Sequence, residues 1–426
     1  MPNLKSKLAI VYDWSMFFSV AEALAPFYGE VLYYHPRPSN FPVLESARIG
    51  YGYPNIRPID EDDLWKAIKD KKVDTVFFPD TGDGGLQNYL RSIGIPVYGS
   101  ELGDKVEIDR LYAKEEFKKN DLLVNKFEVF TDVDKLRAYL EKNEDIYIKI
   151  SYWRGIKESF HHENWKESET WFYNLASKLG PFRHNFQEII VEKPIKGKVE
   201  VGTDRFRTNK KFLNYGLQGI EVKNQVYIAK VVKAAEISPI LKEIDKKAEA
   251  VYDKFDIRSS ISTEVRVPKK DIGFYIDATL RAGFPPMTSM LMAFGSQIGP
   301  IMRAIARNED IEMHKDYNYV AEMILNSESP LKEPQVVKFP KEYEENVKLK
   351  SPCIVDGLHY VLSPESETSV LGTVVCGGDT LQEAIDGCIE IARTVESEGI
   401  YFKEKAFDEA LEDLKAAEKV EAAFNA

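Results

Sequence analysis

The sequence of 426 residues is poor in cysteine and has no long apolar run. Its three cysteines, Cys353, Cys376 and Cys388, are too few and too scattered for a disulfide framework or a zinc site. No apolar stretch approaches the roughly 18 residues of a membrane span. The first segment, MPNLKSKLAIVYDW, leads directly into a predicted strand and shows neither a signal peptide nor a transit peptide. These absences predict a cytoplasmic protein.

Further absences exclude classes of function. No GxGxxG follows the first predicted strand, so a dinucleotide site is not expected. The chain shows no convincing Ser-His-Asp or Cys-His set, so a nucleophilic side chain is not expected either. The formal net charge of -12 argues against general binding to nucleic acid or anionic membranes. It still allows a local basic pocket around a phosphate.

Residues 7 to 100 alternate apolar strands with helical patterns, which is typical of a parallel sheet wrapped by helices. The strands are KLAIVYD, GEVLYYH, VDTVFFPD and IPVYGS, and the helices are expected at Ser15–Ala25, Glu61–Lys71 and Gly85–Ile93. Ligands of such sheets lie beyond the carboxyl ends of the strands, where the loops Asp13–Ser15 and Asp80–Gly85 are predicted. An ordinary strand-to-helix turn explains the glycines of the second loop about as well.

The stretch from Ser262 to Phe284 predicts a hairpin with a turn at PKKDIG. Glu264 lies on the first strand, and alternation puts Asp277, Thr279 and Arg281 on one face of the second. Two facing carboxylates repel each other unless a cation lies between them, and oxygen ligands favour Mg²⁺ carrying nucleotide phosphates. The alternative is an ordinary solvent-facing row of acidic side chains.

Lys149 interrupts the apolar strand DIYIKIS and needs an anionic partner or a route to water. A lysine that protects an edge strand is the alternative. Trp153–Gly155 and Lys157 follow, and then His161 and His162. Adjacent histidines point different ways and lack the spacing of a helical metal site, so we expect a surface or substrate-facing pair.

The strands QEIIVEKPI and VEVGTDRF are predicted to form an antiparallel pair with a short loop, with Glu192 and Glu200 near their ends. A basic group follows, which either binds a phosphorylated substrate or forms a solvated loop. Its members are Arg205, Arg207, Lys210 and Lys211.

Taken in order, these residues resemble the ATP-grasp ligases. That superfamily has a lysine at the start of its central domain, a strand lysine, an acidic hinge segment, a glutamate and a closing [ED]-x-N-x-R. The corresponding residues here are Arg110, Lys149, VEKPIKGKVE from Val191 to Glu200, Glu264, and DATLR from Asp277 to Arg281. The resemblance implies a multidomain α/β and α+β chain with the ATP-grasp fold.

Three patches resemble one branch, the phosphoribosylamine-glycine ligases. They are VDTVFFPDTGDGGLQNYLRSIGIPVYGSE, VEIDRLYAKEEFKK and LGTVVCGGDTLQEAIDGCIEIARTVESEGIYFK. The implied division is an N-terminal parallel domain at 1–104, ATP-grasp subdomains at 105–190 and 191–334, a C-terminal domain at 335–403 and an amphipathic helix at 404–426. That last helix is expected to be an extra packing or oligomer element.

The chain departs from this branch at several positions. Arg110 replaces a lysine, which preserves charge and changes the geometry of a phosphate contact. Thr279 replaces an asparagine that helps to bind metal. The segment SYWRGIKESF keeps one glycine of a glycine-rich phosphate loop, and the first strand lacks the turn that receives a ribose phosphate. These departures weaken the case for a purine-pathway substrate.

The resemblance implies ATP and Mg²⁺ as cofactors. Roles follow for the metal (Glu264, Asp277 and Thr279), the phosphates (Arg110 and Lys149), adenine (Glu192 and Ile195), ribose (Glu200) and the transferring group (Arg281). The implied reaction joins a small carboxylate, such as an amino acid, to an amine through an acyl phosphate and releases ADP and phosphate. The alternatives are a nucleotide-binding module without turnover and an ATP-grasp kinase. A homodimer is compatible with the sequence, which names neither substrate.

Overall fold

The computed structural model describes residues 4–14, 16–36, 48–70, 72–151, 159–184, 188–197, 199–328, 334–362 and 369–424. The N-terminal part is a parallel sheet of five strands in the order β3-β2-β1-β4-β5. Its elements are β1 (Leu8–Tyr12), α1 (Phe18–Leu24), β2 (Glu30–Tyr34), β3 (Ile56–Ile59), α2 (Glu61–Lys69), β4 (Val73–Phe77), α3 (Gly84–Ser92) and β5 (Val97–Tyr98). This confirms the predicted parallel sheet, although β3 was not foreseen because its sequence, IRPI, carries no apolar run.

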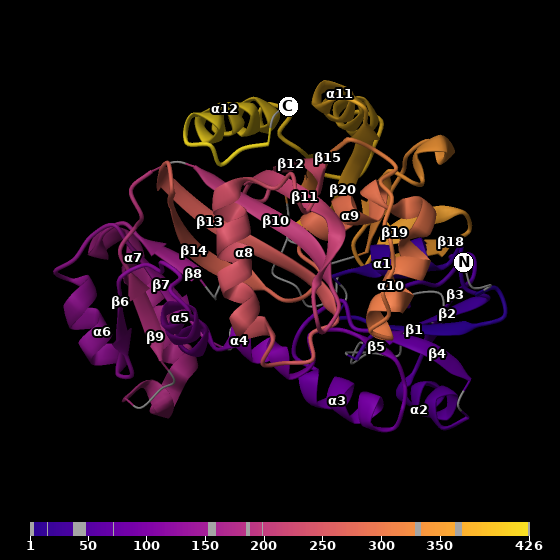
Figure 1. Cartoon of the computed structure of the whole chain (residues 1–426), viewed down its shortest axis with the longest axis horizontal. Coiled ribbons are helices and arrows are strands. Elements are labelled where there is room, and N and C mark those ends of the chain that lie inside the picture. The colour runs from indigo at the N-terminus through magenta and orange to yellow at the C-terminus, as the bar shows by residue number, and fades with distance from the viewer. Residues whose placement is uncertain are drawn as a thin grey trace.

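Two short helices, α4 (Asp104–Ile108) and α5 (Arg110–Lys119), lead to a separate four-stranded antiparallel sheet, seen on the left of Figure 1. Its order is β6-β9-β7-β8, and it packs on α6 and α7. The bounds are β6 (Phe127–Phe130), α6 (Val133–Leu140), β7 (Ile146–Ile150), β8 (Ser159–His162), α7 (Trp165–Leu179) and β9 (Ile189–Glu192). Lys149 therefore lies on a strand with neighbours on both sides, which rules out the edge-strand explanation.

A nine-stranded antiparallel sheet forms the centre of the molecule. Its order is β14-β13-β10-β11-β12-β15-β20-β17, with β21 also paired to β15. The strands are β10 (Glu200–Arg207), β11 (Phe212–Val222), β12 (Val226–Lys233), β13 (Ser259–Lys269), β14 (Ile272–Thr279), β15 (Tyr319–Ser327), β17 (Val347–Leu349), β20 (Val370–Gly378) and β21 (Ile400–Tyr401). β9 and β10 lie in different sheets, so the predicted pairing of these two strands is wrong.

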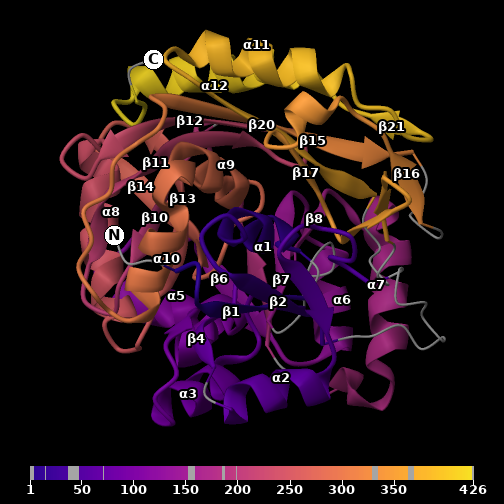
Figure 2. The ribbon, with the colours of Figure 1, turned by 90° about the vertical axis from the view of Figure 1, so that its right-hand side faces the viewer.

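Helices cover both faces of this sheet (Figures 1 and 2). α8 (Pro239–Tyr252), α11 (Leu381–Ala392) and α12 (Ala406–Lys419) pack on the outer face. α9 (Pro286–Ala293), α10 (Ile298–Ala306) and α1 pack on the inner face, in one core with the N-terminal sheet. Because both faces are covered, β15 is buried along its whole length.

The C-terminal part adds a small sheet in the order β16-β19-β18. Its strands are β16 (Gln335–Val337), β18 (Pro352–Val355) and β19 (Leu358–Val361), and short 3₁₀ turns lie at Glu101–Gly103, Gly180–His184, Gly295–Gln297 and Lys341–Tyr343. The division into five parts stays a prediction, since the nine-stranded sheet takes strands from both 191–334 and 335–403. No helix of the described residues is long and apolar enough to span a membrane.

The predicted hairpin is confirmed, with a shorter turn than expected. β13 continues through Pro268 to Lys269, and β14 begins at Ile272, so Lys270 and Asp271 alone make the turn. Asp271 adopts φ 62°, a left-handed conformation that aspartate tolerates better than most residues. Glu264 and Asp277 are direct partners in the antiparallel register.

Candidate functional site

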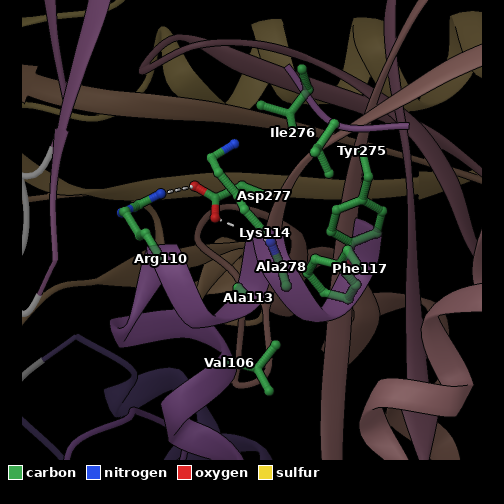
Figure 3. A pocket seen from close by; sticks show the side chains of 10 residues that line it. Val106, Arg110, Ala113, Lys114, Phe117, Tyr275, Ile276, Asp277 and Ala278 are labelled. Atoms are coloured by element: carbon green, nitrogen blue, oxygen red, sulfur yellow. Dashed lines mark hydrogen bonds and ion pairs between the residues drawn. The ribbon is translucent and has the colours of Figure 1, made fainter. Parts of the chain in front are cut away.

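Helix α5 presents two cations to the second strand of this hairpin. The helix begins at Arg110, where Asp109 caps it by accepting a hydrogen bond from the Tyr112 N–H. Lys114 lies one helical turn further on, so both side chains project from the same side of α5. In Figure 3 they approach Asp277 on β14.

Five charged residues from four elements meet here, and we call them the charge cluster: Arg110, Lys114, Lys149, Glu192 and Asp277. Arg110 Nη1 lies 2.7 Å from Asp277 Oδ2, and Lys149 Nζ lies 4.0 Å from the same oxygen. Lys149 Nζ is also 3.9 Å from Glu192 Oε2, and Lys114 Nζ is 2.5 Å from Glu192 Oε1. These pairs gather three buried cations around two carboxylates.

The electrostatics of the charge cluster favour the ionised form of Asp277. Burial alone raises the pKa of Asp277, but Arg110 and Lys149 outweigh it and hold that pKa well below its usual value. Burial lowers the pKa of Lys114, although Glu192 opposes this effect. The cations of the cluster are therefore held close together around ionised Asp277.

An apolar wall adjoins the charge cluster. A small pocket beside Arg110, Lys114 and Asp277 is lined by Val106, Ala113, Phe117, Val124, Tyr275, Ile276 and Ala278 (Figure 3). Tyr275 donates or accepts a hydrogen bond with the Tyr252 hydroxyl at 2.6 Å, and its ring packs on Phe117. This wall limits water near the charges, which strengthens their interactions.

A second group of charges surrounds Glu264, and we call it the acidic cluster: Glu200, Glu221, Glu264 and Lys223. Lys223 Nζ lies 2.9 Å from Glu264 Oε1, 3.0 Å from Glu221 Oε2 and 3.7 Å from Glu200 Oε1. Glu200 also forms an ion pair with Arg266. Burial and the neighbouring carboxylates Glu264 and Glu200 raise the pKa of Glu221 to about 7, although Lys223 opposes them.

Arg281 lies just beyond β14 and is held by other acidic residues. Its Nε is 3.0 Å from Glu107 Oε1 and 3.3 Å from Asp80 Oδ1. Glu107 also accepts a hydrogen bond of 2.9 Å from the Leu280 N–H. Asp80 belongs to the loop predicted as a ligand loop of the N-terminal sheet, so Arg281 connects that loop to the hairpin.

The structure thus brings most of the sequence-predicted site residues into two adjacent clusters. Arg110, Lys149, Glu192 and Asp277 meet in the charge cluster, and Glu200 and Glu264 meet in the acidic cluster. Thr279 ends β14 opposite Ser262, and Ile195 lies in the connection between β9 and β10. Arg281 stands apart, bound to Glu107 and Asp80.

Sequence reasoning missed three residues of these clusters and one neighbour, Asn125. Lys114 could have been found from its spacing of four from Arg110 on a predicted helix. Asn125, whose Nδ2 donates to Glu192 Oε2 at 3.2 Å, carries no comparable signal. Glu221 and Lys223 belong to β11 and its turn, and a charged turn beside a strand is too common to single out.

Other expectations for this region are corrected by the structure. His162 is fully buried, and its Nε2 lies 3.1 Å from Leu140 O and 2.9 Å from Asn143 O, so it is a structural residue. His161 pairs with Asp145 and stacks on Tyr147. Trp153–Gly155 and Lys157 lie outside the described residues.

The basic group at the end of β10 and just after it divides into two buried arginines and two exposed lysines, so the solvated-loop alternative holds for the lysines and not for the arginines. Arg205 is buried beside Asp245, with Nη1 to Oδ2 at 3.3 Å, and Arg207 is buried in an ion pair with Asp253. Lys211 contacts Asp310 at 2.7 Å on the surface, and Lys210 is exposed beside it. The arginines point towards α8, where their acidic partners are the buried Asp245 and the exposed Asp253.

Comparison with known proteins identifies the fold. No protein-family model matches the sequence. The phosphoribosylamine–glycine ligase of Thermotoga maritima is similar over 93% of this chain and 99% of its own, with a TM-score of 0.71 and 14% identity. The biotin carboxylase domain dimer of Hydrogenobacter thermophilus 2-oxoglutarate carboxylase, solved with MgADP, ADP and bicarbonate, has a TM-score of 0.67 and 14% identity over 96% of this chain and 98% of its own.

An N5-carboxyaminoimidazole ribonucleotide synthetase, solved as an ADP complex, is similar over 92% of this chain and 97% of its own, with a TM-score of 0.61 and 14% identity. These proteins match nearly the full length of the chain at low identity, so the likeness extends to the arrangement of all three main sheets. The chain therefore has the ATP-grasp fold that these three proteins share.

Proposed function

We propose that this protein is an ATP-dependent ligase that joins a small carboxylate to an amine. The observation that carries the proposal is the charge cluster, in which three buried cations outnumber two carboxylates beside the Glu264–Asp277 pair. Clustered cations next to paired oxygen ligands match a nucleotide triphosphate and its metal ion.

The residues present fit a magnesium ion. Glu264 and Asp277 are register partners on adjacent strands and offer hard carboxylate oxygens, and Thr279 adds a hydroxyl at the end of β14. Mg²⁺ bound there would neutralise charge on the terminal phosphates. Asp277 keeps its negative charge over the whole physiological range because Arg110 and Lys149 hold its pKa low.

The remaining residues divide the work of binding ATP. Arg110 and Lys149 would contact phosphates, and Lys114 would hold Glu192 in place through its 2.5 Å ion pair. Glu192 and the Ile195 backbone would bind adenine, and Glu200 the ribose hydroxyls. Entry of the phosphates would give Arg110 and Lys149 new anionic partners and leave Asp277 available to the metal.

The chemistry needs positioning and charge stabilisation more than a reactive side chain. A carboxylate takes the terminal phosphoryl group and becomes an acyl phosphate, and an amine then displaces phosphate to form the amide. Arg281, held by Glu107 and Asp80, would stabilise the transferring group. We further propose a cytoplasmic enzyme with small-molecule substrates and a homodimeric assembly.

The first test is direct binding of MgATP by titration calorimetry. Lys149→Met should weaken binding about 10- to 100-fold, because a charge-assisted contact to phosphate is lost. Lys247→Met is the matched control, since Lys247 pairs with Glu243 on the exposed side of α8 at 2.8 Å. Equal affinity of wild type and Lys149→Met would remove Lys149 from the site.

The second arm measures ADP, phosphate and condensed product with mixed carboxylates and amines. Amine-dependent product supports the ligase, whereas a phosphorylated product without amine identifies a kinase. ATP binding without turnover in any pool identifies a binding module. Glu264→Gln and Asp277→Asn should each abolish Mg-dependent turnover with an unchanged circular dichroism spectrum, and full turnover in both would contradict the metal assignment.

A further inference from the structure

The acidic cluster contains a protein cation at a place where its carboxylates outnumber it. Among the ion pairs of the described residues, Lys223 is the cation shared by Glu221 and Glu264, at 3.0 and 2.9 Å. Glu200, the third carboxylate, has Arg266 as a second partner. Three carboxylates thus gather around this ammonium, and a divalent cation is another partner that such a group of oxygens can bind.

The position of Lys223 allows its side chain to move away from the carboxylates into water. It lies in the turn between β11 and β12, closed by a hydrogen bond from Gln225 N to Val222 O at 3.0 Å. Its side chain is 51% exposed, whereas those of Glu221 and Glu264 are 20% and 33% exposed. The half-exposed ammonium can therefore turn towards water while the carboxylates stay in place.

The sheet holds those carboxylates at fixed positions. Glu264 lies between Asp277 on β14 and Gly202 on β10, and Glu221 lies opposite Tyr227 on β12. Gly219, the partner of Gly202 on β11, also lacks a side chain, and Tyr227 lies over it to reach Asp204. Strand positions of this kind keep the acidic side chains preorganised when their counter-ion is exchanged.

Both proposed metal ligands thus carry a protein cation in the same structure. Arg110 and Lys149 neutralise Asp277, and Lys223 neutralises Glu264. Arg110 and Lys149 would exchange Asp277 for phosphates, but Lys223 would have to give way to the metal ion itself.

We propose that Lys223 is a displaceable counter-ion that occupies the cation position beside Glu264 and competes with the divalent metal for it. Lys223 acts through Glu264 and Glu221, so it is a positioning residue and sets the metal concentration at which the site fills. The inference rests on the proposed function, because it takes Glu264 as a metal ligand.

The experiment measures binding of Mn²⁺ to the full chain without nucleotide, by the electron paramagnetic resonance signal of the free ion. Lys223→Met should tighten binding about five- to tenfold, because a competing positive charge next to the ion is removed from a half-exposed site. Lys223→Arg keeps the charge and should stay within about twofold of wild type. Lys247→Met, which removes the same charge from the surface of α8, should have no effect.

A second arm adds ATP to the wild type and separates the two proposals. Absence of MnATP binding to the wild type contradicts the proposed function. If the wild type binds MnATP and Lys223→Met leaves the Mn²⁺ affinity unchanged, the counter-ion role of Lys223 is overturned. Weaker MnATP binding by Lys223→Met, with no gain in nucleotide-free Mn²⁺ affinity, would also overturn it and make Lys223 a nucleotide ligand.

Discussion

At the scale of single residues, buried acids on the inner face of the large sheet stand out. Glu322 on β15 is fully buried and accepts a hydrogen bond of 2.8 Å from the Ser289 hydroxyl. Burial raises its pKa from 4.5 to about 8, although the bonds from Ser289 and Thr373 oppose the shift. Asp204, also buried, has its pKa raised to about 6 mainly by burial.

The raised pKa of Glu322 predicts a pH dependence of stability. The folded protein keeps a proton that the unfolded chain loses near pH 4.5, so the favourable term is complete below pH 4.5 and is lost as pH rises towards about 8. Glu322→Gln has no titrating group at this position, so its free energy of unfolding should fall less as pH rises than that of the wild type. The two falls should differ by several kcal/mol at most. Urea denaturation at pH 6 and pH 8.5 measures it.

Glu243→Gln serves as the control for this comparison, because Glu243 lies on the surface of α8 and pairs with Lys247. It should change the free energy of unfolding by less than about 1 kcal/mol at either pH. A Glu322→Gln variant with the same pH profile as the wild type would show that Glu322 is ionised in the folded protein.

Residue-scale prediction from the sequence succeeded where a pattern fixed the geometry. The hairpin pattern placed Glu264 and Asp277 on adjacent strands, and their register confirms it. Prediction from the sequence failed where the partners of a residue come from distant segments of the chain. Arg205 and Arg207 read as a basic surface run, yet Asp245 and Asp253 on and after α8 take them into the core, and nothing local in the sequence indicates that pairing.

At the scale of elements, one hydrogen bond across β11 depends on Gly219 having no side chain. Tyr227 on β12 passes over Gly219 and donates a hydrogen bond of 2.5 Å to Asp204 on β10. A Cβ at Gly219 would lie 2.3 Å from the Tyr227 hydroxyl. Tyr227 thus links β12 to β10 across β11 through the space that a side chain at Gly219 would fill.

Gly219→Ala should lower the free energy of unfolding by about 2–4 kcal/mol, because Tyr227 must move and Asp204 loses its donor. Gly85→Ala is the control: Gly85 lies in the first turn of α3, and a Cβ there would meet nothing within 4 Å. That control should be neutral or stabilising by about 0.5–1 kcal/mol. Equal stability of both variants in urea denaturation would mean that Tyr227 has another way across the sheet.

Element prediction from the sequence was reliable for strongly patterned segments and unreliable for short ones. The parallel strands β1, β2 and β4 carry apolar runs and were all expected. β8, with the sequence SFHH, was missed because its residues form a strand only by pairing with β7. The resemblance to ATP-grasp ligases made up for this missed strand, because the order of the motifs predicted the ATP-grasp fold as a whole.

At the scale of the whole molecule, the N-terminal domain shares a core with the rest of the chain. Apolar residues of α1 and the N-terminal sheet pack in one cluster with α9, α10 and the inner face of the large sheet. An ion pair strengthens this contact: Asp74 on β4 lies 2.8 Å from Arg303 Nε and 3.1 Å from Arg307 Nη2. We therefore expect the N-terminal domain to unfold together with its neighbours.

Arg303→Met should lower the free energy of unfolding by about 2–4 kcal/mol, because buried Asp74 then keeps one of its two ion pairs, the one with Arg307. Arg393→Met removes an exposed pair with Glu404 and should cost at most about 1 kcal/mol. The measurement is urea denaturation followed by both fluorescence and circular dichroism. Two separate transitions in the wild type would contradict a shared core.

The position of β15 has a consequence for how the chain is made. This strand is buried along its whole length, with β12 on one side and β20, from near the end of the chain, on the other. During synthesis β15 leaves the ribosome before β20 has been made. One edge of this apolar strand therefore stays unpaired until the residues of β20 follow. Prematurely terminated chains that end before Val370 should therefore aggregate rather than fold, which makes complete translation a condition for solubility.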